Sequence, residues 1–303
     1  MQPTDVRTHV LIDYLQLSSI DSASYISKVL SKYFIVGSHK RNEHWHSNKY
    51  NINDEYTLIH SYNTENINQN TLKLCQPTIP QQLHLHQLLN KLQIQHKISK
   101  FELAFDLSPA TADTTTGDIH GWMAMHLHQR YVGRSIDPFW YENTYYTRPT
   151  RQKQGRASRG LKLYQKIFGV QEVVRCEIEM KRQYLRRKGM KFPLTQIPDP
   201  VANTLGFLEF DQRKFEKFLA KENLRAIKPE PRSMQELVRA VQKKDHHWKK
   251  YFKPLDTWNE YFQQSLDQFN LEMAQEIEAI ARDTGSGDGG DGGGEEDQDD
   301  GYD

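Results

Sequence analysis

Cysteine is scarce in this chain and long apolar runs are missing. These two absences argue against a disulfide-rich secreted protein and against a membrane protein. Cys75 and Cys176 are the only cysteines among 303 residues, and their separation fits no zinc-binding spacing, so we expect a reducing compartment. No stretch approaches the roughly 20 apolar residues that a membrane helix requires, and the N-terminal segment MQPTDVRTHV contains no apolar signal region. We therefore expect a soluble, cytoplasmic protein without a membrane partner.

Basic residues are absent from the last 20 residues of the chain. The formal net charge of +1 for the whole chain therefore conceals a basic segment at residues 1–283. Residues 284–303 hold eight acids and no Lys or Arg; taking these eight from 39 leaves 31 acids against 40 basic residues in 1–283, a formal charge of +9. Such a segment suits nucleic acid, although many basic proteins bind none. The tail is rich in Gly and Asp and cannot bury a core, so we expect it to be disordered.

The first half of the chain predicts strands and helices in the order β-α-β-β-α-β. The expected strands alternate apolar and polar residues, the helices repeat apolar residues at helical spacing, and Pro80 fits a first helical turn. The strands cover residues 8–18, 55–62, 71–75 and 98–108, and the helices cover residues 21–34 and a segment that begins at Pro80. This order is typical of a split βαβ unit, in which helices cover one face of an antiparallel sheet.

The second half predicts a looser repeat of the same pattern and then a change to helix. We expect a helix and three strands, then three helices, at residues 118–131, 144–147, 161–166, 173–181, 211–222, 233–244 and 255–282. The predicted fold class is α+β, with antiparallel sheets from two βαββαβ-like units of the ferredoxin or RRM-like kind, helices on one face and a helical C-terminal region. The chain then divides into residues 1–198, 199–283 and the tail 284–303.

Acidic side chains recur on two of the expected strands at a spacing of two residues. Because side chains alternate along a strand, Glu102 and Asp106 share one face, and Arg175, Glu177 and Glu179 share one face of theirs. Neighbouring strands of this kind would gather carboxylate oxygens, the ligands that suit Mg²⁺ or Mn²⁺. A solvated face of an amphipathic sheet would give the same pattern.

A tyrosine pair lies on a third strand, within a strongly basic part of the chain. Residues 144–191 hold fourteen Lys or Arg and only three acids, and basic groups suit a phosphate backbone. Tyr145 and Tyr146 must point to opposite faces of their strand, so at most one can share the carboxylate face. A divalent ion with nearby Lys162 or Lys166 would favour the phenolate and neutralise an attacked phosphate. A tyrosine packed within the sheet is the alternative.

Four segments in order resemble the motifs of the Rep_trans-type rolling-circle replication initiators, the plasmid and phage replication initiation factor family. LIDYLQL at 11–17 is similar to the family's opening strand, with Asp13 in place, and KFELAFD at 100–106 resembles its strand with two acids. TYY at 144–146 and LKLYQK at 161–166 resemble its tyrosine and Y-D-K motifs, with Gln165 in place of the Asp. VRCEIEMK at 174–181 resembles its V-R-x-E strand. The similarity covers about residues 8–190.

This resemblance implies a DNA-nicking enzyme that uses Mg²⁺ or Mn²⁺. A tyrosine would attack one origin strand, leaving a 5′-phosphotyrosyl link and a free 3′-OH primer. Aligned on the family motifs, Tyr146 is the nucleophile, with Tyr145 as the alternative, and Lys166 contacts the scissile phosphate. The expected metal ligands are Glu102, Asp106 and Glu177.

The same resemblance assigns roles to residues 1–198 and 199–283 and implies partners for the protein. Residues 1–198 would be the catalytic nicking domain and 199–283 a DNA-specificity or partner region. The partners would be origin DNA, both double-stranded and extruded single-stranded, together with a host helicase and polymerase, and a homodimer is possible. The expected DNA contacts are basic residues of the loop and the two strands that follow it, namely Arg148, Arg151, Lys153, Arg156, Arg159, Lys162 and Arg175.

Three other interpretations remain open from the sequence. A conjugative relaxase would use the same chemistry at a transfer origin, and a non-catalytic nucleic-acid-binding protein would use the sheet and basic loop without cleaving. Another class of nickases holds its metal with a His-hydrophobe-His triplet, which occurs at 84–86 and at 126–128. Both triplets lie in helical patterns, where residues i and i+2 diverge by roughly 200°, so the two imidazoles of each would not share an ion.

Overall fold

The computed structural model describes residues 1–40, 43–66, 69–129, 136–141, 144–149, 159–197, 205–221 and 233–285. The strands are β1 Val6–Ser19, β2 Phe34–Lys40, β3 Trp45–Ile52, β4 Tyr56–Asn63, β5 Asn70–Cys75, β6 His96–Pro109, β7 Leu127–Gln129, β8 Ile136–Tyr141, β9 Thr144–Pro149, β10 Arg159–Phe168, β11 Gln171–Lys181, β12 Leu205–Phe210 and β13 Phe252–Pro254. The helices are α1 Ala23–Leu30, α2 Ile79–Lys91, α3 Thr116–His126, α4 Arg182–Arg187, α5 Gln212–Lys221, α6 Met234–Gln242 and α7 Asp256–Gly285.

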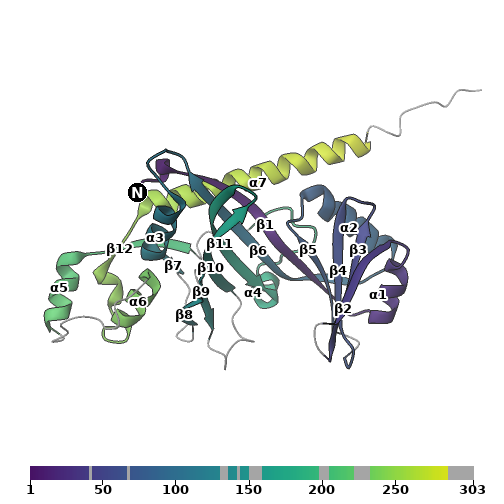
Figure 1. Ribbon diagram of the computed structural model, residues 1–303, viewed down its shortest axis with the longest axis horizontal. Coiled ribbons are helices and arrows are strands. Elements are labelled where there is room, and N and C mark those ends of the chain that lie inside the picture. Colours follow the sequence, from purple (N-terminus) through teal and green to yellow (C-terminus); the bar gives the residue numbers. More distant parts are fainter. Residues whose placement is uncertain are drawn as a thin grey trace, which may run out of the picture.

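One long antiparallel sheet organises these elements (Figure 1). Its ten strands follow the order β2-β3-β4-β5-β1-β6-β11-β10-β9-β8, and every neighbouring pair is antiparallel. The longest strands, β1 and β6, lie side by side in the middle, and a separate small sheet joins β7, β12 and β13. The predicted α+β class with a large antiparallel sheet is therefore confirmed.

Most of the expected elements are present, but the first half contains more strands than predicted. Four strands, β2 to β5, lie between α1 and α2, where the sequence predicts two. The additional strands β2 (FIVGSHK) and β3 (WHSNKYNI) contain many polar residues and lack a clear apolar–polar alternation. They form strands because β2 pairs with β3 and β3 pairs with β4. The helix predicted over 118–131 ends at His126, because residues 127–129 pair with β12 as β7.

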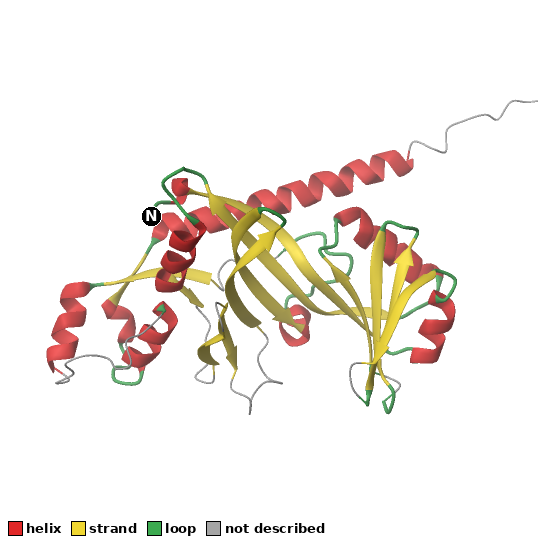
Figure 2. Cartoon of the chain, in the orientation of Figure 1, coloured by secondary structure: helices red, strands yellow, loops and turns green. Residues whose placement is uncertain are grey.

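The main core lies on one face of the large sheet, which the helices cover (Figure 2). Along β6 the buried apolar residues that face this core include Phe101, Leu103 and Phe105, and along β11 they include Val174, Cys176 and Ile178, as the alternation predicts. Helices α2, α3, α4 and α7 contribute buried residues to the same core. Full burial of each large apolar side chain contributes about 1.5–3 kcal/mol. Because these apolar side chains face the helices, alternation puts Glu102 and Glu177 on the other face, where they are buried as well.

The C-terminal region contains the three predicted helices and, in addition, the strands β12 and β13, and its parts belong to two different cores. Residues of α5 and α6 pack in a small separate cluster that includes Phe218, Val238 and Tyr251. Helix α7 instead packs on the main core through Trp258 and Phe262 and runs along the large sheet toward α2 (Figure 1). The acidic tail predicted to be disordered lies almost entirely outside the described residues. Among the described helices, none combines the length and apolar character needed to cross a membrane.

Candidate active site

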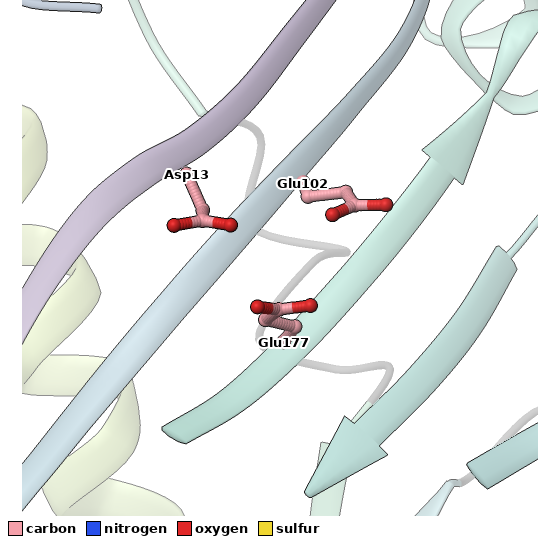
Figure 3. Close-up of side chains that lie close together, drawn as sticks. All are labelled: Asp13, Glu102 and Glu177. Carbon is pink, nitrogen blue, oxygen red and sulfur yellow. The ribbon is translucent and has the colours of Figure 1, made fainter. Parts of the chain in front are cut away.

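Three carboxylates from three neighbouring strands meet on the face of the sheet opposite the core. Asp13 on β1, Glu102 on β6 and Glu177 on β11 each place one oxygen within 4.8 Å of the others (Figure 3). Glu102 and Glu177 are buried, at 6% and 2% exposure, and Asp13 is half-buried. Within the described part of the chain, this is the one group of His, Cys, Asp or Glu side chains close enough to share a cation.

Asp13 lies on this face next to an irregularity in β1. Ile12 pairs with Leu103 and Tyr14 pairs with Glu102, so the register shifts by one residue and Asp13 has no partner on β6. Before the shift the buried residues of β1 include Val10 and Ile12, and after it they include Leu15 and Leu17. A β-bulge changes the alternation in this way and can redirect a side chain. Asp13 alternates with the core residue Ile12 and so projects toward the carboxylates of β6 and β11, whereas the bulge after it returns Leu15 to the core (Figure 3).

The ammonium group of Lys162 lies between the two glutamates. Its Nζ donates to Glu177 Oε2 at 2.6 Å and to Glu102 Oε2 at 3.1 Å. Burial alone would lower the pKa of Lys162, but the charges of Glu177 and Glu102 outweigh burial and raise that pKa. Lys162 is therefore a positive charge within the carboxylate group, and 17% of its side chain is exposed. Its expected contact with DNA stays a prediction.

Arg175 binds two carboxylates of this face, those of Asp106 and Asp13. It is fully buried, with 0% exposure, and its Nε and Nη2 each donate to one oxygen of Asp106 at 2.5 Å. Its Nη1 donates to Asp13 Oδ1. Two predictions need correction here. Asp106 accepts a bidentate bond from Arg175 and is replaced by Asp13 in the three-carboxylate group, and Arg175 is too buried to contact DNA.

Asp13 is held in its ionised form by several neighbours. Burial alone would raise the pKa of the Asp13 carboxyl, but the hydrogen bond from Gln76 and the charges of Arg175 and Lys166 outweigh burial and lower that pKa. Gln76 Nε2 donates to Asp13 Oδ1 at 3.1 Å, and Lys166 Nζ lies 3.5 Å from the same oxygen. Lys166, predicted to contact a phosphate, thus lies at the edge of the carboxylate group with 27% of its side chain exposed.

The charges on this face balance among the described residues. The five acids are Asp13, Glu102, Asp106, Glu177 and Glu179, and the five cations that pair with them are Lys100, Lys162, Lys166, Arg175 and Lys181. We call these ten side chains the charged face. These charges neutralise one another without an ion, and Lys162 Nζ lies between Glu102 and Glu177, so a divalent cation would have to displace that ammonium group to bind there.

The two candidate tyrosines point in opposite directions, as predicted. Tyr145 pairs with Leu163 and is 1% exposed in the main core, where burial raises the pKa of its hydroxyl. Tyr146 is half-buried and pairs with Lys162, which itself pairs with Glu177. Paired residues share a face, so Tyr146 lies on the charged face, two strands and about 10 Å of backbone from Glu177.

Tyr164 is a member of this face that the sequence analysis did not assign. Its hydroxyl donates to Glu177 Oε1, and burial together with the Glu177 charge raises the pKa of Tyr164. A raised pKa keeps the hydroxyl protonated, so Tyr164 suits positioning of Glu177 better than nucleophilic attack. The period of two along β10 was the available signal, since it places Lys162, Tyr164 and Lys166 on one face.

The remaining predicted sites lie elsewhere or outside the described residues. Arg151, Lys153, Arg156 and the side chain of Arg148 fall outside the described part of the chain. Arg159 lies over the ring of Tyr184, with Cζ 5.1 Å from the ring centroid.

The two histidines of each His-hydrophobe-His triplet contact different groups, but only the first triplet lies within a helix as predicted, since His126 ends α3 and His128 lies on β7. His84 contacts Glu55, whereas His86 contacts His96. His126 contacts the carbonyl of Leu208, whereas His128 lies beside Trp248.

The donor set of the three-carboxylate group fits a hard divalent cation. Mg²⁺ and Mn²⁺ prefer carboxylate oxygens, and Mg²⁺ is usually held by one or two carboxylates together with waters and substrate phosphates. Asp13, Glu102 and Glu177 supply such oxygens from one face, within 4.8 Å of each other. The fit requires the Lys162 ammonium to move aside, because it now contacts two of the three.

A comparison with protein-family models and with curated proteins finds no match to this chain.

Proposed function

We propose that this protein is a DNA nicking-joining enzyme that initiates rolling-circle replication, with Tyr146 as its nucleophile. One observation carries the proposal: Tyr146 lies on the same sheet face as the three-carboxylate group, separated from Glu177 by Lys162 alone. The span of about 10 Å between the backbones of Tyr146 and Glu177 leaves room for a phosphate group. The burial of Tyr145 in the apolar core supports Tyr146 over Tyr145 as the nucleophile.

The proposed ligands of a divalent cation are Asp13, Glu102 and Glu177. When bound, such an ion would polarise the scissile phosphate and neutralise the charge that develops on it. The protein's own contribution is positional. Lys162 lies between Tyr146 and Glu177 on neighbouring strands, where its charge favours the phenolate of Tyr146 once it leaves the glutamates.

The proposed reaction is a transesterification in which bond energy is conserved. The Oη atom of Tyr146 forms a bond to phosphorus, and the bond between phosphorus and the 3′ oxygen breaks. The hydroxyl proton of Tyr146 passes to the departing 3′ oxygen, directly or through solvent. The products are a 5′-phosphotyrosyl link and a 3′-OH, and the reverse reaction rejoins the strand.

A second candidate function follows from the balanced charges of the charged face. Its ten side chains neutralise one another without an ion, so the face can be purely structural, in a nucleic-acid-binding protein that does not cleave. A conjugative relaxase shares the chemistry of the first proposal and differs only in its DNA target.

A nicking assay separates these candidates. Purified protein is incubated with supercoiled plasmid bearing the replicon's origin and Mg²⁺ or Mn²⁺, and open circles and covalent protein–DNA adducts are counted. We expect both products from the wild type and from Tyr145→Phe, and neither from Tyr146→Phe. The two variants are a matched pair, because each removes one hydroxyl from adjacent positions. DNA binding without any nicking under both metals would favour the non-catalytic candidate.

We also propose the finer features of fold and partnership that the resemblance implies. The order β4-β5-β1-β6, with α1 and α2 as connections, supports a split βαβ unit extended by the hairpin β2–β3. The second half follows α3 with the meander β8 to β11, so we restrict the ferredoxin-like proposal to the first half. Origin DNA, a host helicase and polymerase, a homodimer and a cytoplasmic location belong to the same proposal.

A further inference from the structure

A large cavity beside α4 is lined by cations and contains no acid. It has a volume of about 1080 Å³ and lies where the end of α2, the start of β6, α4 and the segment after α4 meet. An adjoining cavity of about 320 Å³ shares four lining residues with it, Gln95, His96, Lys97 and Arg182. We call the two cavities together the basic groove. Neither lining includes an Asp or Glu.

The cations of the basic groove differ from those of the charged face in lacking acidic partners. Within the described residues, no carboxylate pairs with Lys97, Arg182, Arg186 or Lys191, whereas each lysine of the charged face pairs with at least one. Arg182 and Arg186 are four residues apart on α4, where like charges destabilise a helix. Unpaired cations held this close in a concave surface favour an anionic ligand.

The two histidines of the groove wall lie in one hydrogen-bonded chain. His96 Nδ1 lies 2.8 Å from the carbonyl of Ile94 and donates to it, so His96 Nε2 accepts from His86 Nδ1 at 3.2 Å. Asn90 Nδ2 then donates to His86 Nε2 at 3.1 Å. Burial and the neighbouring His96 lower the pKa of His86, which agrees with a neutral ring. The lysines and arginines of the lining, Lys97, Lys191, Arg182 and Arg186, give the groove its positive charge.

The groove also offers an aromatic surface and lies near the charged face. Trp45 and Ile20 line the smaller cavity, and Ile20 is 67% exposed. Lys97 pairs with Ser18, on the same side of the sheet as the carboxylates. Glu102 lies five residues along β6 from Lys97, a distance of about 16 Å in a strand. A strand that reaches Tyr146 can therefore extend into the groove.

We propose that the basic groove binds the phosphodiester backbone of a single-stranded nucleic acid, with Arg182 and Arg186 on the phosphates and Trp45 stacked on a base. A positive groove combined with an aromatic side chain is the arrangement by which proteins hold single strands. The inference deepens the proposed function and rests on it for the choice of DNA. It gives the nicking protein a second contact with the strand, remote from the bond that is broken.

Binding without cleavage tests the groove independently of the nicking reaction. The protein carries Tyr146→Phe throughout and is titrated in EDTA against a short fluorescein-labelled oligothymidylate, with anisotropy as the readout. We expect Arg182→Gln with Arg186→Gln to weaken binding at least about tenfold. The slope of log K against log salt should fall by about 1.4, because each phosphate contact on a single strand contributes about 0.7.

The matched control is Arg187→Gln with Lys188→Gln, which removes two charges from the same segment but none from the groove lining. This control should keep the affinity and the salt slope near those of the parent, and Trp45→Leu should weaken binding without changing the slope. Equal losses in the two double variants would overturn the proposal, since they would reflect net charge alone. Competition by ATP or inorganic phosphate at lower concentration than the oligonucleotide would overturn the assignment to a nucleic-acid strand.

Discussion

Lys162 and Glu177 are cross-strand partners whose charged groups meet, with Nζ 2.6 Å from Oε2. The same Nζ lies 3.1 Å from Glu102 Oε2, so one ammonium group serves two of the three carboxylates that could hold a cation. An ammonium group and a divalent ion cannot both occupy the space between these oxygens. Lys162 is therefore placed to stabilise the ion-free protein and to oppose the entry of an ion.

Replacing Lys162 with methionine is expected to raise the affinity for Mn²⁺ by about tenfold or more, because the ion no longer competes with the ammonium group. The same change should lower the free energy of unfolding of the ion-free protein by about 3–5 kcal/mol, as when one partner of a buried ion pair is removed. Isothermal titration with Mn²⁺ and urea denaturation in EDTA measure the two effects.

The matched control for Lys162→Met is Lys181→Met. Lys181 contacts Glu179 at 2.9 Å and none of the three candidate ligands, and 42% of its side chain is exposed. We expect it to leave Mn²⁺ affinity unchanged. Equal Mn²⁺ affinity in both variants and the wild type would show that Lys162 does not occupy the ion's place.

Asp13 and Asp106 should respond differently to loss of charge. Asp13→Asn removes one of the three candidate ligands, so Mn²⁺ affinity should fall by about tenfold or more. Asp106→Asn removes the partner of Arg175 instead, so Mn²⁺ affinity should change little while stability falls. Electron paramagnetic resonance of bound Mn²⁺ reports the affinities. A larger loss in Asp106→Asn than in Asp13→Asn would restore Asp106 as the ligand.

Removal of Arg175 should be among the most destabilising changes on the charged face. Arg175→Met leaves Asp106 and Asp13 without the guanidinium that neutralises both, and we expect the free energy of unfolding to fall by about 3–5 kcal/mol. Adding Asp106→Leu should recover part of this loss, because it removes the carboxylate that loses both of its hydrogen bonds from Arg175. Urea denaturation of the single and double variants measures the coupling. Additive losses would mean that the two residues do not interact.

Stability should also fall in mild acid because of a buried histidine in the first half of the sheet. His60 is 0% exposed and contacts Asn70 and Ser27, and burial lowers its pKa to about 4. The unfolded chain takes up a proton near pH 6.5 while the folded protein resists it, so stability is complete above that pH and declines toward pH 4.

The expected loss from His60 between pH 7 and pH 5 is about 2 kcal/mol, from 1.36 kcal/mol per pH unit below 6.5. Urea denaturation at the two pH values measures this loss. His60→Gln serves as the comparison, because it keeps polar atoms without a group that titrates in this range. The same decline in wild type and His60→Gln would assign the pH dependence to other residues.

The sequence predicted the strands that carry the site better than the strands that flank it. On β6 and β11 the alternation is regular, so the faces of Glu102 and Glu177 followed from a period of two. Strands β2 and β3 contain many His, Ser, Asn and Lys residues, and they are strands because of their neighbours rather than their own pattern. The sequence of a short segment does not show which distant strand it will pair with.

Alternation alone gave no single answer for Asp13. Counted from Val10 and Ile12, a period of two puts Asp13 on the face opposite the core, but counted back from Leu15 and Leu17 it puts Asp13 in the core. The register shift between Ile12 and Tyr14 removes that regularity, and the strand order places β1 beside β6. The resemblance of the opening strand drew attention to Asp13, but pairing across strands far apart in sequence gives it a place beside Glu102.

The most direct test of the central claim is to identify the residue that becomes attached to DNA. Wild-type protein is incubated with origin DNA and Mn²⁺, the adduct is digested with trypsin and nuclease, and the nucleotide-bearing peptide is sequenced by mass spectrometry. We expect the nucleotide on Tyr146. Attachment at Tyr145, Tyr164 or any other residue, or nicking that leaves no protein on the DNA, would contradict the account.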